Sequence, residues 1–327
     1  MIGRGRARKA SAAGSRGVSL VELLVALTIG GILIYGATKM YVGSRKIYEV
    51  NKSAARLQET ARYALGVIEP DVRMSNYWGL VKGAGAITGS SRPTDPSLGA
   101  PTDCGNNFAH HLLSALEGSN NSYNLPCAPH TAAVSSADTL TVRRASIAAS
   151  TPTNNRLQVC STRVAGRLFS DGGACTAPPA GQVNDLLVNT YYVDQNSGTP
   201  SLRRKALKAG PAFSDEEITP GVEDLQVQFG IDPTGDSGTA TRYVNPGAVP
   251  ANAQIVSVRL WILARSEARE IGFKNDRVYE YGDRDEANGT TSDVSDPSAA
   301  TRAYAPNDGF RRLLVSRTIH VRNALGT

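Results

Sequence analysis

Residues 17–42 read GVSLVELLVALTIGGILIYGATKMYV, a stretch that is almost wholly apolar from Val18 onward. At about 1.5 Å per residue, a helix of this length can cross a bilayer core of about 30 Å. A carboxylate, Glu22, lies near the start of the run, where burial in hydrocarbon is costly unless the charge is paired. The stretch therefore predicts a membrane span that carries one charge in need of a partner.

The residues before the span are basic and include no acidic residue. They contain Arg4, Arg6, Arg8, Lys9 and Arg16. By the positive-inside tendency, this pattern keeps the N-terminus in the cytoplasm and directs the rest of the chain outward. A secretory signal also starts with basic residues, but its apolar core is shorter and a small-residue cleavage site follows it. Here the small residue, Gly17, precedes the apolar run.

This order of basic leader, Gly17, Val18 to Glu22 and long apolar helix resembles the class III leader of type IV pilins and pseudopilins. The resemblance implies cleavage between Gly17 and Val18 by a prepilin peptidase, followed by methylation of the new amino group. It also implies that Val18 and Glu22 dock subunits, because Glu22 can pair with the free amino terminus of a neighbour. Val18 departs from the family, which usually has Phe there. The alternative is a plain signal anchor with a stray glutamate.

Composition excludes some function classes. The chain has 327 residues, of which 41% are apolar and 20% are charged, so it can build a sizeable globular core. The net charge is +6, and the basic leader supplies most of it. Once the leader is removed, bulk electrostatics give no support to a nucleic-acid partner.

Apolar residues continue past the span at helical spacing, which predicts one long helix over about 18–69 with an amphipathic second half. The stripe consists of Ile47, Val50, Ala54, Leu57, Ala61, Ala64 and Ile68. Pro70 should end or kink the helix, although a further turn through Met74 is an alternative. The resemblance to pilins implies that a segment of this helix can lose helicity in a filament, for which Gly30 and Gly31 are the candidates. The alternative is that these glycines let neighbouring helices approach.

The second part of the chain shows strand patterns, several of them alternating as in half-buried antiparallel strands. The predicted strands are 139–145, 157–164, 185–194, 201–207, 222–231, 254–265 and 312–322. Residues 183–207 form a predicted hairpin with its turn at 195–200. Residues 79–135 read as long loops with short elements, and 282–309 as an exposed acidic loop.

The predicted fold is α+β and pilin-like, with a long N-terminal helix packed on a C-terminal antiparallel sheet. We divide the chain into a cleaved leader (1–17), a transmembrane helix half (18–42), an amphipathic helix half (43–76) and a β-rich globular domain with long loops (77–327).

Later segments narrow the resemblance to PilW-type minor pilins. The similar segments are 191–194, 221–232, 256–266 and 310–323. Strands of this composition also occur in J-type pseudopilins of type II secretion. Leu80 departs from the minor pilins, which often have a cysteine at this place.

Four cysteines, Cys104, Cys127, Cys160 and Cys175, occur near His110, His111 and His130. Their spacing matches no common zinc frame, which leaves a metal site or free thiols as the lesser alternatives. The compartment that the resemblance implies is oxidising and favours disulfides. Of the three connectivities that four cysteines allow, we favour the nearest pairs, Cys104 with Cys127 and Cys160 with Cys175.

Three motifs suggest other chemistry. Residues 235–238, Gly-Asp-Ser-Gly, resemble a serine-protease nucleophile segment, but Thr239 follows where a glycine is needed and turn chemistry explains the motif. The glycines of 83–89 lack the strand and helix context of a dinucleotide loop. Asp283, Asp285 and Asn288 could bind calcium, yet they are out of EF-hand register, and a solvated loop is the preferred interpretation.

The resemblance and the residues together predict a non-enzymatic minor pilin without a cofactor, which takes part in a priming or tip complex of a type IV pilus. It would lie in the bacterial inner membrane with a periplasmic C-terminal domain and then in the pilus tip. The implied partners are other minor pilins, the major pilin, the prepilin peptidase/methyltransferase, the inner-membrane assembly platform and a tip adhesin. The alternatives are a J-type pseudopilin and a tip module that binds a surface or an adhesin.

Overall fold

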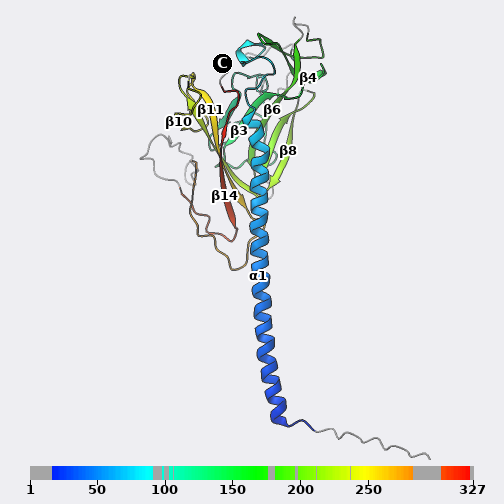
Figure 1. The fold of residues 1–327 in the computed structure, drawn as a ribbon, viewed down its shortest axis with the longest axis vertical. Coiled ribbons are helices and arrows are strands. Elements are labelled where there is room, and N and C mark those ends of the chain that lie inside the picture. Colours follow the sequence, from blue (N-terminus) through cyan, green and yellow to red (C-terminus); the bar gives the residue numbers. More distant parts are fainter. Residues whose placement is uncertain are drawn as a thin grey trace, which may run out of the picture. The chain divides into compact units, whose positions relative to one another are not determined.

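The computed structural model describes residues 17–90, 98, 103–105, 107–175, 181–195, 198–210, 212–235, 237–282 and 303–324 (Figure 1). The chain divides into two compact units, Met1–Lys52 and Ser53–Thr327.

A single helix, α1 (Leu20–Arg73), contributes to both units (Figure 1). Within the first unit its apolar side chains are exposed; Leu20 is 78% exposed and Ile32 is 71% exposed. By length and composition the helix could cross a membrane, and none of its apolar stretch is buried within the chain. The helix is continuous through Gly30 and Gly31.

In the second unit the amphipathic half of α1 buries the predicted stripe from Leu57 onward, with Ala61, Ala64 and Ile68 on the same face. Leu57 and Ala61 pack with Ala264. The helix does not end at Pro70 but reaches Arg73. A proline interrupts only the bond to the preceding turn, and the Met74 amide still donates to the Pro70 carbonyl at 3.1 Å. Of the two predictions for the end of the helix, the structure therefore shows the further turn beyond Pro70.

The larger sheet has the strand order β1-β5-β4-β6-β3-β2; off this path, β7 pairs with β6 and β8 pairs with β7. Its strands are β1 (Ile87–Thr88), β2 (Leu116–Ser119), β3 (Thr139–Ala145), β4 (Asn154–Ser161), β5 (Gly166–Asp171), β6 (Gln182–Asp194), β7 (Ser201–Leu207) and β8 (Phe213–Pro220). All pairs are antiparallel except β1 with β5. The β6–β7 hairpin pairs Asp194 with Ser201, as the sequence predicts.

The second sheet is antiparallel, with the order β10-β9-β11-β14. Its strands are β10 (Arg242–Val244), β9 (Val222–Asp232), β11 (Gln254–Arg265) and β14 (Arg312–His320). A short ribbon joins β12 (Tyr279–Glu280) to β13 (Ala303–Tyr304). We expected one sheet, and the structure has two larger ones. Among the described strands no ladder joins the two sheets, and the apolar face of β9 packs in one core with strands of the larger sheet.

The main core combines α1 with residues from both larger sheets. It includes Ile68 of α1, Val142 and Tyr191 of the larger sheet, and Leu225 and Val258 of the second sheet. The α+β class, with a long N-terminal helix packed on antiparallel sheet, is therefore confirmed.

A second cluster lies under the long segment between α1 and β3. Trp78, Phe108 and Leu112 of this segment pack with Leu157 and Val188. The prediction of long loops with short elements agrees with the structure here, where a 3-10 turn (Ala84–Ala86), β1 and β2 are the regular elements among the described residues.

Candidate functional site

Gly17, Val18 and Ser19 precede α1, which begins at Leu20, and have no regular secondary structure. Glu22 lies in the first turn, where the partial positive charge of a helix N-terminus stabilises a carboxylate. Val18 is 71% exposed and Val21 is 68% exposed. Within the described part of the chain, no ion pair reaches Glu22. Among the described residues, nothing supplies a charge partner for Glu22 in an apolar environment.

Exposed apolar side chains continue along the first unit from Val18 to Val42. Their exposure in water would be unfavourable by about 25 cal/mol for each Å² of apolar surface. Lipid, or the helices of other subunits, can supply the missing apolar surroundings. The segment can therefore insert into a lipid bilayer, pack against other apolar helices and bring the Glu22 carboxylate to a positively charged partner.

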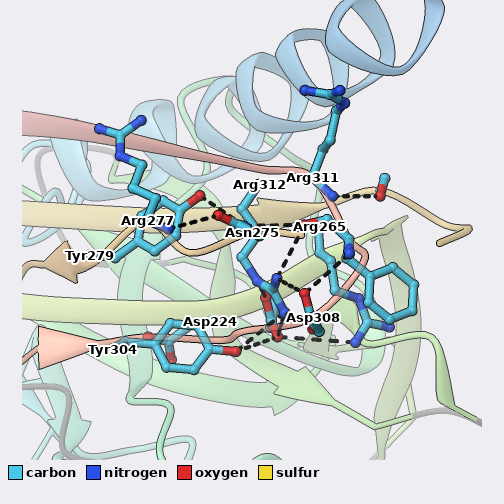
Figure 2. Close-up of polar contacts among 12 residues, drawn as sticks. Asp224, Arg265, Asn275, Arg277, Tyr279, Tyr304, Asp308, Arg311 and Arg312 are labelled. Carbon is cyan, nitrogen blue, oxygen red and sulfur yellow. Dashed lines mark hydrogen bonds and ion pairs between the residues drawn. The ribbon is translucent and has the colours of Figure 1, made fainter. Parts of the chain in front are cut away.

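A polar cluster in the second unit holds the C-terminal region to β9. The guanidinium of Arg312, whose side chain is 1% exposed, donates to Glu223 from Nε at 2.5 Å and from Nη2 at 2.9 Å. It also donates from Nη1 to Asp308 at 2.6 Å. Figure 2 shows Asp308 and Tyr304 beside this guanidinium, and the Tyr304 hydroxyl donates to Glu223 at 2.9 Å.

The electrostatics of this cluster follow from its geometry. The hydrogen bond from Arg312 lowers the pKa of Asp308 below its usual value, against a smaller opposing effect of burial. Burial lowers the pKa of Arg312, but its hydrogen bonds to Asp308 and Glu223 outweigh burial and raise that pKa. The cluster thus stays charged at neutral pH and joins β9 to β14.

Aromatic rings and an amide extend the same cluster. The guanidinium of Arg265 lies 4.3 Å from the centre of the Phe310 ring. The side-chain amide of Asn275 donates to the Phe310 carbonyl at 3.1 Å, and the Tyr281 hydroxyl donates to Asp224 at 2.7 Å. Glu223 and Arg312 lie in segments that resemble the minor pilins, but the sequence does not predict that they pair. The available signal was two opposite charges in strand-like segments.

The four cysteines form two disulfides, Cys104–Cys127 and Cys160–Cys175. Cys104 belongs to the cluster under the long segment, and Cys160 packs with Phe169 and Val183. The histidines are elsewhere: His111 Nδ1 lies 3.9 Å from Glu117, and the backbone amide of His130 donates to Tyr192. The structure does not bring the histidines and cysteines together into a metal frame among the described residues.

Leu80 stands where a cysteine is common in the minor pilins, and its amide donates to the Ser161 hydroxyl at 2.9 Å. The adjacent Gly79 adopts a positive φ of 81°, and a Cβ there would lie 2.4 Å from the same hydroxyl. This turn therefore contacts β4 beside Cys160 without a covalent link.

Ser237 is placed in a turn after β9. Its hydroxyl donates to Asp232 at 2.8 Å, and the amides of Ser237 and Gly238 donate to the same carboxylate. The carboxylate thus orders the turn, and among described residues no histidine hydrogen-bonds Ser237. Asp283, Asp285 and Asn288, the candidate calcium ligands, lie outside the described residues.

Comparisons with known proteins give two family matches. Residues 190–323 match the model described as type IV pilus-assembly protein W, and residues 13–38 match the prokaryotic N-terminal methylation motif. The first match contains the Glu223, Asp308 and Arg312 cluster, and the second contains Gly17, Val18 and Glu22.

Among solved structures, a type IV-like pilin from Thermus thermophilus aligns with 14% sequence identity and a TM-score of 0.36. The alignment covers 82% of this chain and 98% of that one. No curated protein matches the chain.

Proposed function

We propose, from the premise that this chain is a PilW-type minor pilin of the type IV pilin class, that it joins a short complex that primes pilus assembly and remains at the tip. The peptidase cuts between Gly17 and Val18, and the new amino group is methylated. The chain then lies in the inner membrane with its globular domain in the periplasm. It is a structural subunit and needs no cofactor of its own.

Its partners in this role are other minor pilins, the major pilin, the prepilin peptidase/methyltransferase, the assembly platform and a tip adhesin. The energy for assembly comes from the machine that extracts the subunits. The leader motif and the exposed apolar helix support membrane anchoring and association with a pilus.

The observation that carries the proposal is Glu22, a carboxylate on an apolar helix with no ion pair from the described residues. In a packed bundle, the free amino terminus of a neighbouring subunit neutralises this charge at the same depth. A buried pair of this kind fixes register more than it adds stability. Glu22 would thus select the axial position at which the subunit docks.

The Glu22→Gln variant tests this role, because it removes the charge and keeps the size of the side chain. We expect the variant to enter the membrane fraction normally and to be lost from sheared pili. The matched control is Glu49→Gln, the same change at an exposed position of α1 beyond the apolar stretch. Normal recovery of Glu22→Gln in pili would refute the docking role.

Processing is tested separately by intact mass. The wild-type chain should begin with a methylated Val18, whereas Gly17→Asn should retain the leader in the membrane. A chain that begins at Val18 in the Gly17→Asn variant would show that another signal directs cleavage.

Co-purification distinguishes the pilus from a secretion filament. The wild-type chain should be recovered with pilus components after cross-linking in cells. Recovery with type II secretion pseudopilins and without pilus components would assign the chain to the other filament.

A further inference from the structure

A groove of about 550 Å³ lies beside β2 in the second unit, within the size range of ligand pockets. One wall is formed by residues 113–118, the other by residues 247 and 249–255. We call it the β2 groove. Its remaining lining residues are Ser75, Asn76, Phe229, Val321 and Ala324.

β2 is an edge strand, which among the described strands pairs with β3 alone. The Arg143 amide donates to the Ala115 carbonyl at 2.8 Å, so this pair is a hydrogen-bonded one. Such pairs alternate along an antiparallel ladder. Glu117 is therefore the next residue that bonds to β3, while Leu116 and Gly118 direct their N–H and C=O groups away from it.

The lining shows that this free edge faces the groove. Three consecutive residues of β2, Leu116, Glu117 and Gly118, line it, and Leu113 to Ala115 line it just before the strand. Side chains on one face of a strand would contribute only every second residue. A consecutive run is what the edge of a strand contributes, and an edge presents backbone donors and acceptors that an added strand can satisfy.

The chemistry of the groove selects an uncharged peptide. The far wall carries the apolar side chains of Val249, Pro250, Ala253 and Ile255 beside the uncharged polar side chains of Asn252 and Gln254. Glu117 is the sole ionisable residue of the lining, and Arg143 Nη1 lies 2.8 Å from its carboxylate. A polyanion would find no excess of positive charge. A sugar would find no open ring for stacking, because Phe229 is 1% exposed.

The far wall also limits the shape of the occupant. Residues 247 and 249–255 line the same groove as β2, so a second folded sheet, including β2 of another copy, would have to displace them to pair edge to edge there. A single extended segment fits, and β2 itself provides a length of four residues. At about 3.4 Å per residue, the paired part is about 14 Å long.

We infer that the β2 groove binds an extended, uncharged segment of a different protein subunit, which adds a strand to the larger sheet at β2. Main-chain hydrogen bonds to Leu116 and Gly118 hold the segment, and its alternate side chains contact the apolar far wall. This binding involves none of the residues that dock the apolar helix, so it stands or falls independently of the role of Glu22.

A photo-crosslinking experiment on the full-length chain identifies the occupant. Benzoylphenylalanine replaces Leu113, which lines the groove and is 57% exposed, and the cells are irradiated. The control position is Val164, which is 84% exposed and lies outside the groove. We expect a cross-link from position 113, absent from position 164, that maps to one short segment of another protein.

A synthetic peptide with the sequence of that segment then tests the mode of binding to the full-length chain in detergent micelles. N-methylation of the backbone at alternate residues should weaken binding about tenfold at each lost hydrogen bond, and methylation of the residues between them should not. Ala251→Trp, which fills the groove from its exposed wall, should weaken binding at least as much. Ala149→Trp, at an exposed position outside the groove, should bind normally.

Four results would overturn the inference. In the cross-linking experiment, they are no cross-link from position 113, and a cross-link only to lipid or only to a second copy of this chain. In the peptide experiment, they are equal effects of N-methylation at every residue, and unchanged affinity in an Ala251→Trp variant that retains the wild-type unfolding midpoint.

Discussion

The hydroxyl of Tyr191 donates a hydrogen bond of 2.6 Å to the carboxylate of Asp71, which joins the last turn of α1 to β6. Arg144 donates to the same carboxylate from Nη2 at 2.6 Å, and Asn189 donates at 2.6 Å. Asp71 is 5% exposed. One buried charge therefore attaches the end of the helix to β3 and β6.

Replacing Asp71 with Ala should destabilise the second unit strongly. The change leaves the Arg144 guanidinium and the Tyr191 hydroxyl without their shared acceptor, and removal of one partner of a buried ion pair costs about 3 to 5 kcal/mol. Chemical denaturation of the full-length chain in micelles measures the loss. Glu59→Ala, an exposed change on the same helix, is the control and should alter the free energy of unfolding by less than about 0.5 kcal/mol. Equal effects of the two changes would contradict the anchoring role.

Arg312→Met should also be strongly destabilising. It leaves the carboxylates of Glu223 and Asp308 without the cation that both contact, at a cost of about 3 to 5 kcal/mol. The control is Arg322→Met, because the Arg322 side chain is exposed and lies just beyond β14. Thermal unfolding of both variants checks the prediction. A wild-type midpoint for Arg312→Met would show that water replaces the lost contacts.

The lowered pKa of Asp308 makes part of the stability depend on pH. Because its pKa in the folded state lies below that of an unfolded aspartate, about 3.9, its contribution is present above this pH and is lost as the pH falls through the lower folded value. The difference in free energy of unfolding between wild type and Asp308→Asn should therefore be largest near neutral pH and shrink below about pH 4. Denaturation curves at several pH values test this. A difference that stays constant or grows toward low pH would contradict it.

Helical periodicity predicted α1 and the part of its stripe that is buried, from Leu57 onward, because packing there follows one repeated spacing. Ile47 and Ala54, which the same spacing places in the stripe, are exposed. The partners of Asp71 were not predictable in the same way. They are 73 and 120 residues away in the sequence, and no local pattern specifies which strands meet the end of the helix.

The strand β8 shows a second limit of prediction from hydrophobic periodicity. Its sequence, FSDEEITP, suggests an exposed acidic loop, yet it pairs with β7. The pairing places Arg204 opposite Glu216 and Lys205 opposite Asp215. Cross-strand charge pairs of this kind stabilise a sheet without apolar alternation. The signal was a basic run followed by an acidic run, which hydrophobic periodicity does not detect.

The candidate sites differ in the same way, because one is set by local sequence order and the other by contacts between distant segments. Gly17, Val18 and Glu22 could be selected from sequence because their order along the chain carries the motif. The β2 groove could not, because it forms where residues 113–118 and 247–255 meet in space. A four-residue strand ending in Gly-Ser gives too short a pattern to predict either the strand or its free edge.

The disulfide Cys104–Cys127 should stabilise the long segment between α1 and β3, which has little regular structure of its own. The bond closes a loop with a sequence separation of 23, which corresponds to about 3 kcal/mol in the loop-entropy model. Replacing both cysteines with Ala should therefore lower the unfolding midpoint by about 6 to 12 °C. A reducing agent should lower the midpoint of the wild type at least as much, because it also opens Cys160–Cys175. In the variant it should cause only the smaller shift that belongs to the remaining bond. An unchanged midpoint in the variant would show that the packing of Phe108 and Leu112 against the larger sheet holds the segment without the bond.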